Sequence, residues 1–144
     1  MLKSHETHFV GQIAQKALIF KGGKILLVQY PNHEKNLARG KWDMPGGRLN
    51  VGEDVLAGLK REVWEEIGAE IVIDKILAIG TLTNLSNNQR ILFVIYKTSL
   101  VDDDKLLKLE EAEIGSVRWC DSREFFTLPI VYPEYQEALK KILV

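Results

Sequence analysis

The chain has 144 residues, of which 46% are hydrophobic and 27% charged, the length and composition of one globular domain. Its 19 basic and 20 acidic residues give a formal net charge of −1, so it lacks the basic excess that duplex nucleic acid demands. The single cysteine, Cys120, excludes a disulfide within the chain and a multi-cysteine zinc site. We therefore expect one domain over residues 1–144.

Neither a targeting segment nor a membrane span is evident. The first residues carry charge with no apolar stretch behind them, which argues against a secretory signal. The strongest apolar run, Ile91 to Tyr96, is far shorter than the roughly 20 residues that cross a bilayer. These features predict a soluble, cytoplasmic protein without a membrane partner.

Two apolar runs near the N-terminus, Phe9–Phe20 and Ile25–Tyr30, flank a Gly22-Gly23 pair, a pattern typical of a β-hairpin. A polar loop follows from Pro31 to Lys41, and loops of that length in compact domains are usually functional or disordered. The charged residues of this loop are His33, Glu34, Lys35, Arg39 and Lys41.

The segment Asp54–Ile67 has the periodicity of an amphipathic helix. Its apolar stripe comprises Leu56, Leu59, Val63 and Ile67, and Gly68 is placed to end the helix as a C-cap.

The second half of the chain predicts further strands and a closing helix. Residues 71–73, 76–83 and 90–100 have strand character, and the last of these is apolar on both faces, which favours a central position. Residues 117–120 predict one more short strand. Pro133 to Leu143 predicts a helix whose apolar face holds Leu139, Ile142 and Leu143.

The most informative feature is a cluster of carboxylates on the first helix. At about 100° per residue, Glu62, Glu65 and Glu66 fall within one arc beside the apolar stripe, and Arg61 flanks them. Like charges at this spacing repel one another. A solvated acidic face is the ordinary explanation, but the cluster adjoins the core stripe and follows a glycine-rich loop. Hard oxygen donors with one compensating cation suit Mg²⁺ or Mn²⁺.

The segment from Gly47 to Ala69 resembles the Nudix box, in which glycine, glutamate and an Arg-Glu-hydrophobic-x-Glu-Glu-x-Gly block stand at fixed spacing. The matching positions are Gly47, Glu53, Arg61, Glu62, Val63, Glu65, Glu66 and Gly68. Ala69 is smaller than the aliphatic residue usual at the end of the box. The approach from Trp42 to Gly47 is also similar to that of the family.

This resemblance implies an α/β fold, a Nudix-type α/β/α sandwich around a mixed β-sheet, that hydrolyses a nucleoside diphosphate linked to another group. By the same resemblance, Glu62, Glu65 and Glu66 would ligate Mg²⁺ or Mn²⁺, and the Gly47 carbonyl could add a ligand. Arg61, with Glu53, would orient the carboxylates. A further carboxylate is expected from a later loop, with Glu113 first and Glu111 second, and the general base stays open between Glu62 and this group.

The expected partner is a small nucleotide. Arg39 is the first candidate for a substrate phosphate, with solvated loop charge as the alternative. Residues that would mark ADP-ribose or diadenosine polyphosphate subfamilies are missing, because Leu85, Ser86 and Asn87 occupy those places. Elimination favours a nucleoside triphosphate pyrophosphohydrolase that releases the monophosphate and pyrophosphate.

Other classes stay open. They are an ADP-ribose or nucleotide-sugar pyrophosphatase, a nucleotide-binding sensor without turnover, and an RNA-end hydrolase, which the absence of a basic tract disfavours. The sequence also leaves a homodimer open.

Overall fold

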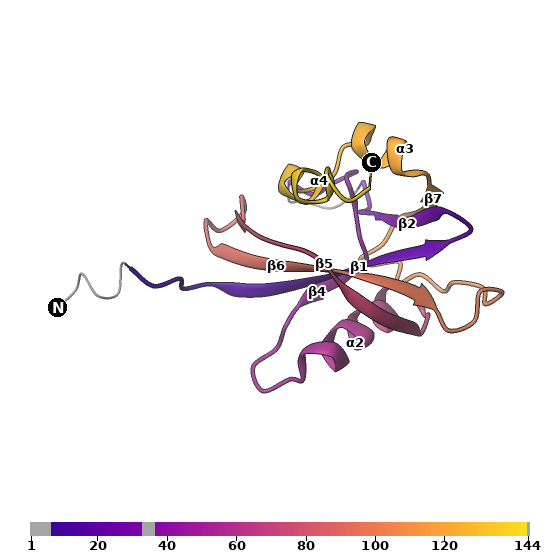
Figure 1. Ribbon diagram of the computed structural model, residues 1–144, viewed down its shortest axis with the longest axis horizontal. Coiled ribbons are helices and arrows are strands. Elements are labelled where there is room, and N and C mark those ends of the chain that lie inside the picture. The colour runs from indigo at the N-terminus through magenta and orange to yellow at the C-terminus, as the bar shows by residue number, and fades with distance from the viewer. Residues whose placement is uncertain (1–6, 33–36, 144) are drawn as a thin grey trace.

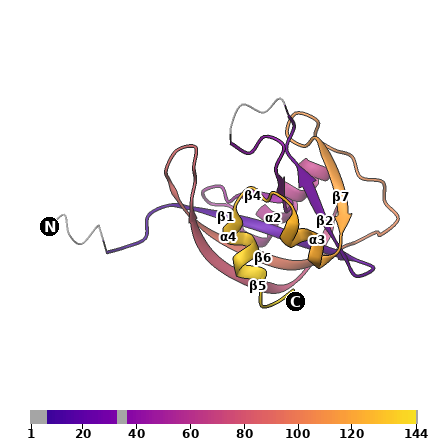
Figure 2. The same cartoon turned by 90° about the horizontal axis from the view of Figure 1, so that it is seen from above.

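The computed structural model describes residues 7–32 and 37–143, and this part of the chain forms a three-layered sandwich (Figure 1). In chain order, the elements are β1 Gln12–Lys21, β2 Lys24–Gln29, β3 Trp42–Asp43, β4 Gly46–Arg48, α2 Val55–Ile67, β5 Ile71–Thr83, β6 Arg90–Leu100, β7 Ser116–Cys120, α3 Ser122–Thr127 and α4 Pro133–Leu139. The sheet separates α2 on one face from α3 and α4 on the other, as the view from above also shows (Figure 2). The expected α/β/α sandwich around a mixed sheet is confirmed.

The strand order is β3-β2-β1-β6-β5, and β1 and β6 are the parallel pair. Two strands share the other edge of β1: β2 pairs with it near the hairpin, and β4 pairs with residues 14–16. The sheet therefore divides along β1, with β2, β3 and β7 in one branch and β4 in the other. This division brings the backbone of β4 next to the middle of β1, where the candidate site lies.

Successive side chains of β1 point to opposite faces of the sheet, so the strand contributes to the core on each face. Ala17 and Ile19 belong to the core beneath α2, whereas Ala14 and Leu18 belong to the core beneath α3 and α4. Lys16 lies between Ala14 and Leu18 in this alternation, so its side chain is on the α4 side of the sheet.

Helix α2 begins and ends where the sequence predicts. The Asp54 side chain accepts a hydrogen bond from the Ala57 amide, and Gly68 closes the helix in the left-handed conformation with φ 65°. The predicted apolar stripe needs one correction, because Leu56 is 45% exposed. The buried face instead includes Gly58 and Glu66, so α2 is turned with Glu66 toward the sheet while Glu65 stays exposed.

Most of the other predicted strands and helices lie where the sequence places them. The hairpin pairs Phe20 with Ile25, and β6 is an interior strand. Several details differ. Strands β3 and β4 are absent from the sequence-based expectations, because two and three residues are too few for a strand pattern. The sequence predicts two strands, at residues 71–73 and 76–83. The structure has one strand over residues 71–83, because pairing with β6 continues beyond the polar residues between them, with two register irregularities. Helix α3 is absent from the sequence-based expectations, although a capping box of Asp121 and Glu124 starts it. Helix α4 ends at Leu139, beyond which Ile142 is half-exposed and adds little burial.

No helix in the described part of the chain is both long enough and apolar enough to cross a membrane.

Leu59 and Leu56 offer a matched test of the orientation of α2. Leu59 is fully buried, whereas Leu56 is half-exposed on the same helix. We expect Leu59→Ala to lower the free energy of unfolding by about 2–5 kcal/mol, because it leaves a cavity between helix and sheet. Leu56→Ala should cost less than about 1 kcal/mol. Urea denaturation of both variants would measure the difference. Equal losses of unfolding free energy would contradict the orientation in which Leu59, and not Leu56, faces the sheet.

Candidate active site

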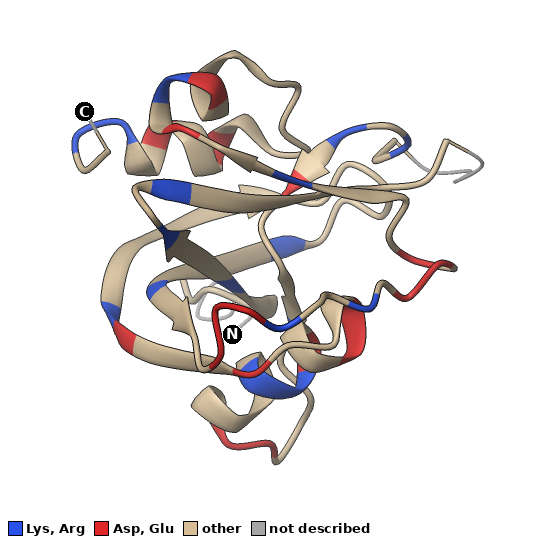
Figure 3. Cartoon of the chain, turned by 90° about the vertical axis from the view of Figure 1, so that its right-hand side faces the viewer, with Lys and Arg blue, Asp and Glu red and all other residues tan. Residues whose placement is uncertain are grey.

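The guanidinium of Arg61 links three carboxylates on and beside α2. Its Nε and Nη2 donate to the two oxygens of Glu53 at 2.6 and 3.0 Å. Nη2 also lies 3.1 Å from Oε1 of Glu62, and Nη1 lies 3.1 Å from Oε2 of Glu65. Figure 3 shows the acidic and basic segments side by side on the helix. Hydrogen bonds from Arg61 lower the pKa of Glu53, and those to Glu53 raise the pKa of Arg61.

Glu62 and Glu66 lie against the glycine-rich segment of β4. The Gly46 amide donates to Oε1 of Glu66 at 2.7 Å. A Cβ on Gly47 would lie 2.5 Å from the Glu62 carboxylate, so only glycine lets this carboxylate approach so closely. Gly46 has φ 143°, and a Cβ there would lie 2.0 Å from the Gln15 carbonyl oxygen. Gly46 thus lets β4 lie close to β1, and Gly47 lets the Glu62 carboxylate lie close to β4.

Burial raises the pKa of both carboxyls. For Glu66, which is 6% exposed, the pKa rises to about 8, chiefly through desolvation, while Lys16 and the Gly46 amide oppose the rise. Desolvation also raises the pKa of Glu62, and Arg61 opposes it. Carboxyl groups held away from water in this way are common at functional sites, where a bound cation restores the charged form.

The donor set matches the needs of a hard divalent cation. Glu62, Glu65 and Glu66 supply carboxylate oxygens from one helix face, and no side chain stands between Glu62 and the Gly47 backbone. Within residues 7–32 and 37–143, no three acidic, histidine or cysteine side chains are grouped closely enough to hold a metal ion together. Arg61 and the Gly46 amide instead hold these carboxylates, so metal binding would require some of these contacts to be exchanged.

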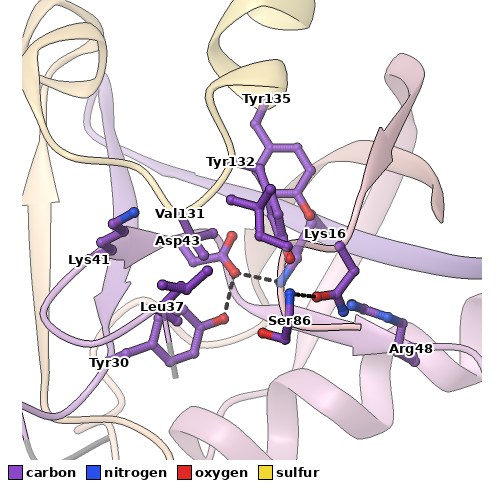
Figure 4. A pocket seen from close by; sticks show the side chains of 13 residues that line it. Lys16, Tyr30, Leu37, Lys41, Asp43, Arg48, Ser86, Val131, Tyr132 and Tyr135 are labelled. Atoms are coloured by element: carbon purple, nitrogen blue, oxygen red, sulfur yellow. Dashed lines mark hydrogen bonds and ion pairs between the residues drawn. The ribbon is translucent and has the colours of Figure 1, made fainter. Parts of the chain in front are cut away.

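A pocket of about 180 Å³ opens on the α4 side of the sheet (Figure 4). Three cations from three segments line it, Lys16 of β1, Lys41 of the turn before β3 and Arg48 of β4. Its other walls include the rings of Tyr30, Tyr132 and Tyr135. The pocket therefore combines positive charge with aromatic surface.

A buried ion pair forms the floor of this pocket. Lys16 Nζ lies 2.8 Å from Oδ2 of Asp43, and their side chains are 4% and 3% exposed. The Tyr30 hydroxyl donates to the same oxygen at 2.5 Å, and the Met44 amide donates to Oδ1 at 2.7 Å. Desolvation disfavours the charged form of Lys16, but Asp43, Tyr30, Tyr135 and Glu66 together raise its pKa well above the usual value. The ammonium is therefore charged.

The Lys16–Asp43 pair is absent from the sequence-based expectations. The available signal was a lysine in the middle of the apolar run Phe9–Phe20, at a position that the alternation of a strand assigns to a buried face. Its partner Asp43 stands just before the glycine segment, in a motif noted only for its resemblance.

The other predicted site residues lie outside these clusters. Arg39 is exposed and does not line the pocket, although Lys41 from the same turn does. Glu111 and Glu113 are exposed and make no ion pair within the described residues. Their turn is nevertheless fastened to α2, because the Glu110 amide donates to the Glu66 carbonyl at 2.9 Å. The predictions for His33 and Lys35 fall outside the described residues.

A comparison with protein families matches residues 12–142 to the NUDIX domain. The chain belongs to the Nudix family. Nudix hydrolases 8 and 2 of Arabidopsis thaliana are 24% and 28% identical over 91% and 90% of this chain, which spans 34% and 45% of their lengths. A crystal structure of a MutT protein from Methanosarcina mazei is 26% identical with a TM-score of 0.76, covering 90% of this chain and 91% of that one. The resemblance of the Gly47–Ala69 box is thus confirmed at the level of the family.

The Nudix helix should make the stability of the metal-free protein depend on pH through Glu66. Lys16 and the Gly46 amide favour the carboxylate, but desolvation, Asp43 and Glu62 outweigh them and raise the pKa from 4.5 to about 8. The folded state holds the Glu66 proton more tightly than the unfolded chain does. The bound proton therefore stabilises the fold fully at a pH below the pKa that Glu66 has in the unfolded chain. This stabilisation is lost as the pH rises through the folded pKa.

Glu66→Gln removes this titration. Between about pH 5 and pH 9, we expect the wild type to lose on the order of a few kcal/mol more stability than the variant. Urea denaturation in the presence of a chelator, at both pH values, measures the difference. Parallel curves for the two proteins would contradict the raised pKa.

Proposed function

We propose that this Nudix domain is a divalent-metal-dependent hydrolase of nucleoside diphosphate derivatives, with nucleoside triphosphates as the preferred substrates. The products would be the nucleoside monophosphate and pyrophosphate. The observation that carries the proposal is the meeting of Glu62 and Glu66 with the Gly46–Gly47 backbone, at a point electrostatically coupled to the floor of a cationic pocket.

The residues of the chain would divide the work. Arg61 and Glu53 hold Glu62 and Glu65 in place, so like-charged carboxylates are kept together before a substrate arrives. Glu62, Glu65 and Glu66, with the Gly47 carbonyl, would hold Mg²⁺ or Mn²⁺. Such an ion neutralises phosphate oxygens and orients the group under attack. Glu62, with its raised pKa, is also suited to accept a proton from the attacking water.

The pocket supports a phosphate-rich substrate. Its charged lining has three cations against one carboxylate, and Asp43 already receives hydrogen bonds from Lys16, Tyr30 and the Met44 amide. Leu85 and Ser86, which stand where ADP-ribose and diadenosine polyphosphate enzymes would carry their marks, also line this pocket. Nucleotide sugars and ADP-ribose are the alternative substrates, and they differ from triphosphates in the charge next to the diphosphate.

A regulatory domain that binds a nucleotide without turnover is the other class of function. The complete carboxylate set and its support by Arg61 favour turnover. Glu113 and Arg39 stay as proposals: Glu113 as a loop carboxylate near the end of α2, Arg39 as a phosphate contact from the turn beside the pocket.

The activity should depend strictly on a divalent cation. Nucleoside triphosphates, ADP-ribose and UDP-sugars would be incubated with metal-stripped protein, then with added Mg²⁺ or Mn²⁺, and the products separated by anion exchange. We expect no turnover in chelator, restored turnover with metal, and monophosphate plus pyrophosphate from triphosphates. Full activity in excess chelator would overturn the metal requirement. Release of diphosphate and inorganic phosphate would overturn the assigned bond cleavage.

Glu66→Gln should separate catalysis from folding. Glutamine keeps nearly the same volume and can still accept from the Gly46 amide, but an amide oxygen is a poorer ligand for a hard dication than a carboxylate. We expect turnover to fall by at least about 10²-fold while the metal-free melting temperature is unchanged or raised. Glu70→Gln, which changes an exposed carboxylate just after the same helix, should stay within about twofold of the wild type in activity. A Glu66→Gln variant that retained most of its turnover would remove Glu66 from the site.

A further inference from the structure

Lys16 lies at the junction between the carboxylates of α2 and the pocket. In the ladder between β1 and β4 it stands opposite Gly46, whose amide holds Glu66. Its charge acts on Glu62 and Glu66 on one side, and on Asp43, Tyr30 and Tyr135 on the other. The ammonium therefore interacts electrostatically with both the carboxylates of α2 and the residues of the pocket.

The ammonium has more donors than the protein uses. An ammonium group carries three N–H donors, and the hydrogen bond from Lys16 goes to Asp43 at 2.8 Å. Lys16 is 3% exposed and lines the pocket, so its ammonium is shielded from bulk water yet borders the cavity. Burying an ammonium costs free energy, which the ion pair with Asp43 offsets, and a phosphate oxygen could accept from the donors that this pair leaves free.

The charge of the pocket indicates what those donors would bind. Lys41 and Arg48 bring two further cations to the same cavity from other segments. Asp43 is the one acidic residue in the lining, and its oxygens already accept from Lys16, Tyr30 and Met44. An uncharged base or sugar would leave this positive charge unbalanced, whereas phosphate oxygens would balance it.

We propose that Lys16 is a substrate-binding residue that donates to a phosphate oxygen from the floor of the pocket, with Asp43 and Tyr30 as the residues that position it. This deepens the proposed function, on which it rests for the identity of the ligand. It assigns the pocket to the part of the phosphate chain beyond the carboxylates of α2. Substrates with a charged group next to the diphosphate would thus be favoured over those with a neutral sugar there.

The test must remove the ammonium without leaving a buried unpaired carboxylate. Asp43→Asn serves as the reference, measured at a pH low enough to keep Lys16 protonated, because the asparagine oxygen can still accept a hydrogen bond although the carboxylate that favours the ammonium is gone. The double variant Lys16→Met/Asp43→Asn differs from that reference only in the ammonium. Lys24→Met, at an exposed lysine of β2, is the control for a general loss of positive charge.

Binding of inorganic pyrophosphate with Mg²⁺, measured by calorimetry, provides a readout that is independent of turnover. We expect the double variant to bind at least about tenfold more weakly than Asp43→Asn, whatever the affinity of that reference, and Lys24→Met to bind as the wild type. Equal affinities of the double variant and Asp43→Asn would overturn the proposal. Melting curves verify that each variant is folded.

A measurement on the unaltered protein decides the matter if the double variant does not fold. Lys16 is the one buried lysine of the described residues, so its ¹⁵N-labelled ammonium should exchange slowly with water and give a distinct NMR signal. We expect this signal to shift on titration with Mg²⁺ and pyrophosphate. A signal that does not move at saturation would overturn the proposal.

The two proposals can fail separately. Pyrophosphate binding that depends on Lys16, without hydrolysis of any nucleotide, would overturn the hydrolase assignment and retain the anion site. Metal-dependent hydrolysis together with Lys16-independent binding would do the reverse.

Discussion

The site depends on the contacts of Arg61 with Glu53, Glu62 and Glu65. Carboxylates at this spacing on a helix repel one another, and burial makes the repulsion more costly. Arg61 offsets this by sharing one guanidinium among three carboxylates, with nitrogen–oxygen distances of 2.6 Å to Glu53 and 3.1 Å to each of the other two. Glu66 lies outside this network and depends on a backbone amide instead. The helix can therefore bury Glu66 and half-bury Glu62 against the protein while Glu65 stays exposed to water.

That orientation in turn depends on the glycines of β4. Because Gly46 and Gly47 lack side chains, the backbone of β4 fits between β1 and the carboxylates of α2. Pairing of β4 with β1 brings Lys16 into register with Gly46 and Gln15 into register with Gly47. One short strand thus links the helix that carries the acidic groups to the pocket that carries the basic ones.

The arrangement favours function at a cost in stability. Lys16, Asp43 and Glu66 are polar or charged groups in positions where apolar side chains would fold at lower cost. Each has a partner, yet Glu66 still has a raised pKa, which shows that its environment favours the neutral acid. A nearby dication and a phosphate chain would balance these charges together. The proposed ligands would therefore stabilise the folded protein by compensating the buried charged groups.

The sequence by itself determined the local elements and the family. Glycines at Gly22–Gly23 and Gly68, the cap at Asp54 and the spacing of Leu59, Val63 and Ile67 act within a few residues, so their structural outcome could be predicted from the chain. The box from Gly47 to Ala69 is equally local, which is why the carboxylate cluster can be recognised without knowledge of its geometry. Helix α3 shows the limit even at short range, because its six residues are too few for a periodic pattern.

The tertiary structure alone decided which side of α2 is buried, how the sheet divides along β1 and which distant residues come into contact. Leu56 belongs to the stripe by pattern but lies at the edge of the helix–sheet contact, and no helical wheel reveals where that contact ends. The Lys16–Asp43 pair joins residues 27 positions apart, and the Arg39 and Lys41 side chains, two residues apart, differ in access to the pocket. Contacts between distant residues and the directions of side chains depend on how the whole sheet packs. Residue type and spacing within a short segment do not determine that packing.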